Sequence, residues 1–116
     1  MAFPYDLRRC AAPAVVSLGV DTPQNGGNTH FADQRAALAS LPGDLCQRID
    51  GLSIKHNAAH DSVGNLRPGF EAFDDPRDAP GAVHKIVRKH DETGDACLYL
   101  GRREWAYIPG LSLEES

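Results

Sequence analysis

Histidine is the residue type in this sequence best suited to hold a metal ion, and the chain contains five of them. His56 and His60 stand four positions apart, which on a helix would place both rings on one face. The surrounding residues, HNAAHDSVGN, do not favour a helix, and the glutamate of the zinc-protease motif does not follow His56. We therefore predict a polar loop here. A metal site assembled from His56, His60 and His84 remains an alternative hypothesis.

The other polar clusters predict no specific chemistry. The carboxylates between residues 71 and 78 do not have the spacing of an EF-hand calcium loop. Gly26-Gly27 lacks the lysine of a phosphate-binding loop. Arg102 and Arg103 could bind an anion, although a solvated pair is the simpler interpretation. The three cysteines lie far apart and form no CxxC pair, so we expect them to be reduced: Cys10, Cys46 and Cys97.

Length and charge narrow the class of protein. A chain of 116 residues is enough for one small domain. The net charge of -4 argues against a nucleic-acid partner, because such proteins carry a basic surface. No apolar run approaches the roughly 20 residues of a membrane helix, so no membrane partner is expected. The N-terminal residues do not resemble a secretory signal, which predicts a cytoplasmic location.

The elements expected in the first half are short. Residues 14–20 are rich in β-branched side chains and predict a strand. A turn-forming stretch, PQNGGN, follows, and residues 29–31 read as the start of a returning strand. Residues 32–41 predict a helix with Asp33 near its start, and Asp44 is the expected cap of a second helix that Gly51 ends. Residues 52–56 alternate apolar and polar, as in a half-buried strand.

The second half contains a long irregular segment between regular ones. Residues 57–80 hold three prolines and few periodic apolar positions, which is typical of a lid or binding loop. Strands are expected at residues 82–88 and 96–100, paired as a hairpin through a turn at 90–95. Residues 105–108 predict another extended piece. Ser112 and Glu115 form a capping box, which predicts a helix start close to the last residue and hence a domain that is incomplete.

Several blocks, in order, resemble the TauD/TfdA family of dioxygenases. TPQNGGNTHFAD, residues 22–33, is similar to the family's P-x-x-GGDT-x-FAD block, with Asn28 where aspartate is usual. DPRDAPGAVHKIVR, residues 75–88, is the most specific match, and HDETG follows it at 90–94. The resemblance covers about residues 12–116, and it departs from one subgroup's pattern at Glu104-Trp105.

The resemblance implies an α+β domain spanning residues 1–116 that is a partial double-stranded β-helix, the jelly-roll of the clavaminate synthase-like folds. It also implies Fe(II) and 2-oxoglutarate as cofactors of the parent enzyme, and a small-molecule substrate that residues 57–80 cover. The family's metal ligands begin with a His-x-Asp pair, which this sequence lacks. No catalytic or metal-binding residue is therefore assigned to the chain.

One functional residue carries over from the family. Thr29 matches the threonine whose hydroxyl binds 2-oxoglutarate, and we favour this role over that of an ordinary strand residue. The expected function is a fragment of an iron(II)/2-oxoglutarate-dependent dioxygenase that hydroxylates a small organic substrate, inactive when alone. The alternative is a non-catalytic binding or subunit-interaction module. The sequence does not distinguish among sulfonates, aryloxy acids and amino-acid derivatives as the substrate. Whether the parent enzyme is a homo-oligomer is also open.

Overall fold

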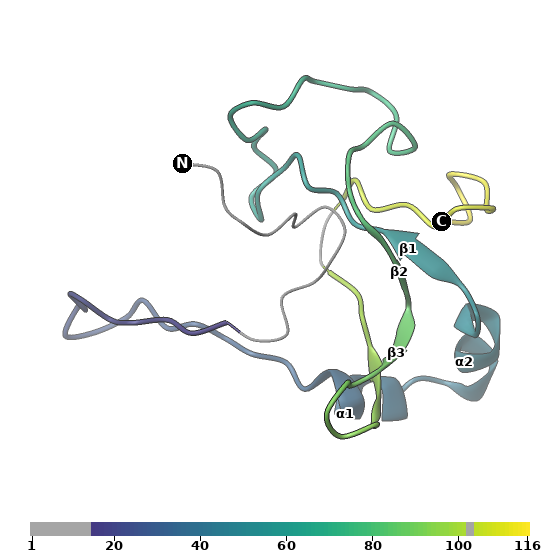
Figure 1. Ribbon diagram of the computed structural model, residues 1–116, viewed down its shortest axis with the longest axis horizontal. Coiled ribbons are helices and arrows are strands. Elements are labelled where there is room, and N and C mark those ends of the chain that lie inside the picture. Colours follow the sequence, from purple (N-terminus) through teal and green to yellow (C-terminus); the bar gives the residue numbers. More distant parts are fainter. Residues whose placement is uncertain (1–14, 102–103) are drawn as a thin grey trace.

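The fold is described by a computed structural model for residues 15–101 and 104–116. Its elements are, in chain order, α1 (Gln34–Ala39), α2 (Gly43–Ile49), β1 (Ser53–Lys55), β2 (Val83–Lys85), β3 (Val87–Lys89) and β4 (Ala96–Leu98). The two helices lie at one end of the molecule and the long loop before β2 lies at the other, with the strands between them (Figure 1). The small α+β class is confirmed. The jelly-roll expected from the resemblance is not seen in the described residues.

Both predicted helices form, but only one has the predicted cap. The side chain of Asp33 accepts hydrogen bonds from the backbone N–H groups of Arg35 and Ala36, at 2.9 and 3.3 Å, so it is the N-cap of α1. The prediction that Asp44 caps α2 is wrong. The N-cap is Pro42, so Asp44 lies within the first turn, where its charge favours the positive end of the helix. Gly51 adopts a φ of +73° just after α2, as expected for a helix stop.

The four strands form two antiparallel two-stranded sheets. β1 pairs with β2, with Ile54 opposite His84. β3 pairs with β4, with Arg88 opposite Cys97, which confirms the predicted hairpin. Tyr107 forms an isolated bridge with Lys55 on the other side of β1, so part of the extended piece expected at 105–108 is also present.

Ile86 separates the two sheets. We expected one continuous strand at residues 82–88, and this expectation is wrong because the chain bends at Ile86 between β2 and β3. The Ile86 N–H donates to the Leu52 carbonyl at 3.1 Å, while its own carbonyl accepts from the Tyr99 N–H at 2.7 Å. Ile86 therefore hydrogen-bonds to the residue just before β1 and to the residue just after β4. The bend lets a short chain build two sheets around one buried side chain.

The core is small and lies where the two sheets meet. Ile54, Ile86 and Leu98 are 6%, 1% and 8% exposed and form one buried cluster. Partly buried side chains from the helices, from the residues just after each helix and from the segment after β4 pack against it: Ala37, Leu38, Leu41, Ile49, Leu52, Ala106 and Ile108. The helices thus cover the core through one face each, which is how short amphipathic helices are stabilised.

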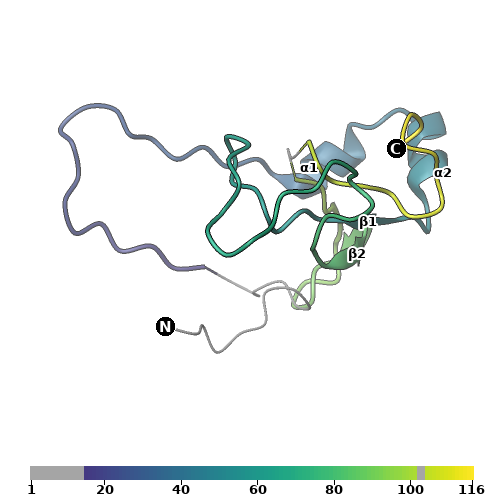
Figure 2. The same ribbon diagram turned by 90° about the horizontal axis from the view of Figure 1, so that it is seen from above.

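Residues 15–33 extend away from the rest of the molecule as an open loop, which we call the arm (Figures 1 and 2). We predicted strands at 14–20 and 29–31. This prediction is wrong for the described residues of both ranges, which form no strand. Val16 and Phe31 are 94% and 92% exposed. Strand propensity reflects packing against neighbouring strands, and the arm has no neighbouring strand within residues 15–101 and 104–116. Residue 14 lies outside the described residues.

Residues 57–80 form the predicted irregular loop, without a helix or strand. The loop is nevertheless anchored at both ends, because the Ala58 N–H donates to the Pro80 carbonyl at 2.8 Å. The capping box at the end of the chain is confirmed: Glu115 accepts from the Ser112 N–H at 3.2 Å, and the Ser112 hydroxyl accepts from the Glu115 N–H. Within the described residues, no helix is both long and apolar enough to cross a membrane.

Candidate functional site

A cavity lies where the start of the long loop meets the segment after β4. Its volume is about 680 Å³, which is in the range of small-molecule sites. We call it the loop cleft. Its described lining consists of Asn57, His60, Asp61, Ser62, Val63, Gly64, Glu104 and Trp105. The expected loop therefore does border a cavity.

Asn57 is a buried polar residue in the lining of the cleft and contacts His60. Its side chain is 3% exposed. The Asn57 carbonyl oxygen accepts from the Ala59 N–H at 2.8 Å, and its amide nitrogen lies 2.8 Å from His60 Nδ1. When the amide donates this bond, Nδ1 is the acceptor and the neutral ring carries its proton on Nε2. Asn57 thus sets both the position and the tautomer of His60.

Three aromatic side chains from separate parts of the chain meet beside the cleft; we call them the aromatic triad. The His60 ring stacks on the Trp105 indole, with centroids 5.4 Å apart and planes 8° apart. Phe73 meets both rings edge-on, at 5.3 Å from His60 and 5.2 Å from Trp105. Stacked and T-shaped arrangements are the favourable ones for such pairs. The triad is therefore a well-formed wall.

Asp61 shapes the rim of the cleft. Its carboxylate accepts from the backbone N–H groups of Val63 and Asn65, both at 2.9 Å. The bonds from Asn65 and Val63 lower the pKa of this carboxyl group below its ordinary value, because they stabilise the charged form. Asp61 is consequently ionised at neutral pH.

The metal site proposed from His56, His60 and His84 does not form. His60 belongs to the aromatic triad, whereas His56 packs against His84 and Tyr99, at 5.7 and 5.0 Å between ring centroids. Burial, and then the nearby Arg88 charge, lower the pKa of His84. Across the described ranges 15–101 and 104–116, no three histidine, cysteine or acidic side chains gather as a metal site would require. The described residues thus do not fit an iron ion.

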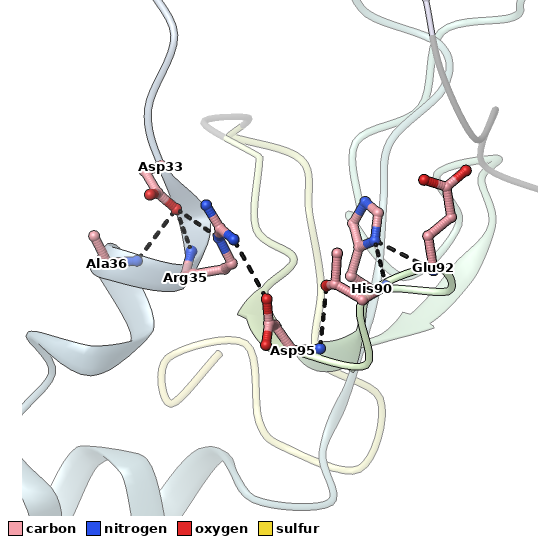
Figure 3. Close-up of polar contacts among 7 residues, drawn as sticks. Asp33, Arg35, Ala36, His90, Glu92 and Asp95 are labelled. Atoms are coloured by element: carbon pink, nitrogen blue, oxygen red, sulfur yellow. Dashed lines mark hydrogen bonds and ion pairs between the residues drawn. The ribbon is translucent and has the colours of Figure 1, made fainter.

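The sequence also contains a His-x-Glu spacing, His90-Asp91-Glu92, inside the hairpin turn. His90 Nδ1 accepts hydrogen bonds from the N–H groups of Glu92 and Thr93, at 3.3 and 3.4 Å (Figure 3). The Nδ1 atom of His90 is therefore used within the turn, and neither His90 nor Glu92 belongs to a group of three possible metal ligands among the described residues. The pair stabilises the turn and does not form part of a metal centre.

An ion pair fastens α1 to the same turn. Arg35 bonds to Asp95 at 3.3 Å and to its own cap, Asp33, at 3.5 Å (Figure 3). Backbone bonds from Arg35 and Ala36 lower the pKa of Asp33. All three side chains are more than half exposed, so the contribution of these ion pairs to stability is small. They lie at the point where the arm joins α1.

Thr29 lies on the arm and is exposed. The structure does not bring it to the loop cleft, whose described lining excludes it. Its assignment to 2-oxoglutarate remains a prediction. Arg102, Arg103 and Cys10 lie outside the described residues, whereas Cys46 and Cys97 are free thiols, as expected. Sequence reasoning missed the aromatic triad, because only the fold brings residues 60, 73 and 105 together.

Comparison with known proteins places the chain in a family. The family model described as "Taurine catabolism dioxygenase TauD, TfdA family" matches residues 7–116. The chain therefore belongs to the TauD/TfdA family, as the resemblance of its sequence blocks predicted. No solved structure matches the chain significantly.

Three relatives illustrate the range of activities within the family. The chain is 38% identical over 112 residues to an (S)-phenoxypropionate/alpha-ketoglutarate-dioxygenase of Sphingobium herbicidovorans. It is 32% identical over 97 residues to an alpha-ketoglutarate-dependent 2,4-dichlorophenoxyacetate dioxygenase of Cupriavidus pinatubonensis, and 32% identical over 94 residues to a putative alpha-ketoglutarate-dependent sulfonate dioxygenase of Schizosaccharomyces pombe. These matches include 91%, 83% and 81% of this chain, but the chain spans only 38%, 33% and 23% of the relatives' lengths.

Proposed function

We propose that this chain is part of an alpha-ketoglutarate-dependent dioxygenase that hydroxylates a small organic substrate. In the proposed reaction, one oxygen atom of O₂ enters the substrate and the other enters succinate, as 2-oxoglutarate loses carbon dioxide. The family match over residues 7–116 carries this proposal. The named relatives support it, since each is described as dependent on alpha-ketoglutarate.

In the proposed enzyme, this chain contributes the loop that covers the substrate and one residue that contacts 2-oxoglutarate. The iron is assigned to residues outside the described part of the chain, because the described residues do not gather a ligand set. Thr29 is the proposed contact, its hydroxyl donating a hydrogen bond to 2-oxoglutarate. In the whole enzyme the arm would lie against further strands of a jelly-roll, which would bring Thr29 into an interior.

A second candidate function is a non-catalytic module that binds another polypeptide. The exposed apolar residues of the arm favour it: Val15, Val16, Leu18, Val20 and Phe31 are each at least 83% exposed. Contiguous exposed apolar surface is typical of interaction sites. The two candidates differ in whether 2-oxoglutarate is consumed.

A chimera tests the dioxygenase proposal. This chain would replace the matching segment of the Sphingobium herbicidovorans relative, to which it is 38% identical, and succinate release would be measured with Fe(II), 2-oxoglutarate and (S)-phenoxypropionate. We expect turnover by the chimera and none by the 116-residue chain alone. A folded chimera that releases no succinate would contradict the proposal, as would stoichiometric Fe(II) binding and turnover by the isolated chain.

Thr29 is tested in the same chimera. Thr29→Ala removes the hydroxyl and is expected to raise the KM for 2-oxoglutarate about tenfold, the effect of one lost hydrogen bond to a charged group. Thr29→Ser keeps the hydroxyl and serves as the matched control, with an expected KM close to that of the parent. Equal KM values for all three proteins would remove Thr29 from the site.

A further inference from the structure

We propose that the loop cleft binds an uncharged planar ring, the aryl group of a small molecule, against its aromatic wall. The inference deepens the proposed function, because it names the substrate class that the long loop would cover. Its role in catalysis rests on that proposed function. The binding itself rests on the geometry of the cleft.

The first argument is that the triad is separate from the core. Ile54, Ile86 and Leu98 form the buried cluster, and neither Phe73 nor Trp105 is among the apolar side chains that pack against it. His60, Phe73 and Trp105 are only partly buried. Three aromatic side chains gathered beside a cavity and left partly exposed are placed to pack against a bound ring.

The second argument is that the wall is organised in advance. Buried Asn57 holds His60 through a 2.8 Å contact, and its other amide atom is used by the Ala59 N–H at 2.8 Å. Phe73 supports both stacked rings from their edges. Because these side chains are already ordered, a bound ring would not have to order them, which is the main cost of binding to a mobile surface. His60 and Trp105 line the cleft, and Phe73 positions them.

The third argument concerns charge. The charged residues in the described lining are Asp61 and Glu104, both acidic. The Asp61 carboxylate stays ionised through its hydrogen bonds to backbone N–H groups. An anionic group placed between them would be repelled, whereas a neutral ring loses nothing by contact with carboxylates at its edge. The cleft therefore suits the ring of an aryl compound better than a carboxylate or sulfonate.

The test uses the 116-residue chain without metal or 2-oxoglutarate. Trp105 is the single tryptophan, so its indole N–H gives one resonance in the ¹⁵N-labelled chain. Titration with 2-phenoxyethanol is expected to shift this resonance saturably. Its saturated analogue, 2-(cyclohexyloxy)ethanol, and the anionic phenoxyacetate are each expected to bind about tenfold more weakly. No saturable shift with phenoxyethanol, or equal binding of the three probes, would overturn the proposal.

Variants separate a ring-binding wall from a merely structural one. His60→Ala is expected to weaken phenoxyethanol binding about tenfold, whereas His60→Phe, which keeps a ring in the stack, should remain within about threefold of the parent. The His60→Phe result decides the matter if His60→Ala does not fold, since loss of binding in a folded His60→Phe protein would contradict the proposal. His30→Ala, on the exposed arm, is the control and should bind as the parent does.

The two proposals fail in distinguishable ways. If phenoxyethanol binds as expected but the chimera releases no succinate, the ring site stands and the dioxygenase role falls. If the chimera is active but the Trp105 resonance does not respond to phenoxyethanol, the dioxygenase role stands and the ring site falls.

Discussion

The arm and the core contain the same kinds of side chain but have opposite environments. In the arm, Val16 and Leu18 are 94% and 86% exposed, whereas in the core Ile54 and Ile86 are 6% and 1% exposed. Both segments have the β-branched composition of strands. The difference lies in the neighbours, because β1 has paired partners on both sides and the arm has none among the described residues.

The reason is topological. The two limbs of the arm are joined by a turn with Gly26 and Gly27 at φ of +83° and +70°, but the second limb has only a few residues before Asp33 caps α1. A lone two-stranded hairpin is marginal in water. The β3–β4 hairpin is no longer than the arm, yet it is stable because α1 and the core cover it. The arm and the β3–β4 hairpin therefore differ in burial, and burial decides which of the two segments forms strands.

The largest effect is expected in the core. Ile86→Ala removes the most buried side chain and breaks the packing between the two sheets, so we expect the free energy of unfolding to fall by about 2–5 kcal/mol. Chemical denaturation measures it. Val83→Ala is the matched control, since Val83 lies in the adjacent strand but is 52% exposed, and its cost should be clearly smaller. Equal costs would mean that the core is not where the structure places it.

A second large effect is expected where the long loop joins β2. A Cβ added to Gly81 would lie 1.6 Å from the His56 carbonyl oxygen, and backbone cannot yield as a side-chain tip can. We expect Gly81→Ala to lower the free energy of unfolding by about 1–3 kcal/mol or more.

Gly43→Ala is the matched control for Gly81→Ala. Gly43 is the first residue of α2, and an added Cβ there meets nothing within 4 Å. The substitution should stabilise the chain by about 0.4–1 kcal/mol. If both glycine variants behaved alike, the close approach of the loop ends to each other would be refuted.

Local features of the fold were predictable from the sequence, and tertiary ones were not. The Asp33 cap, the Gly51 stop and the β3–β4 hairpin depend on neighbours a few residues away, so their residue types are enough to predict them. The bend at Ile86 was missed because the strand-like pattern of residues 82–88 continues through it. The bend places Ile86 between Leu52, just before β1, and Tyr99, just after β4, and both form backbone hydrogen bonds with it.

The candidate site shows the same limit. The prolines and missing periodicity of residues 57–80 predicted the long loop, and its substrate-covering role, which the family resemblance implies, remains a prediction. The aromatic triad could not be predicted, since its three residues are far apart in sequence and share no motif. One usable signal for this site was present in the sequence: Glu104 and Trp105, which line the cleft, depart from the pattern of one subgroup of the family. Thr29 was predicted from the resemblance, and its role depends on a packing of the arm that the described residues do not show.

The smallest effect is expected in the arm, and it tests the comparison directly. Leu18→Ser in the 116-residue chain removes an apolar side chain that is 86% exposed, so the free energy of unfolding should change by no more than about 0.5 kcal/mol. In the chimera, where the arm is proposed to lie against further strands, the same substitution should cost about 2–5 kcal/mol. Denaturation of both pairs of proteins measures the difference. A cost above about 1 kcal/mol in the isolated chain would show that the arm already packs there. An equally small cost in both would show that the arm stays unpaired even in the longer protein, and that Thr29 is then too exposed to hold 2-oxoglutarate.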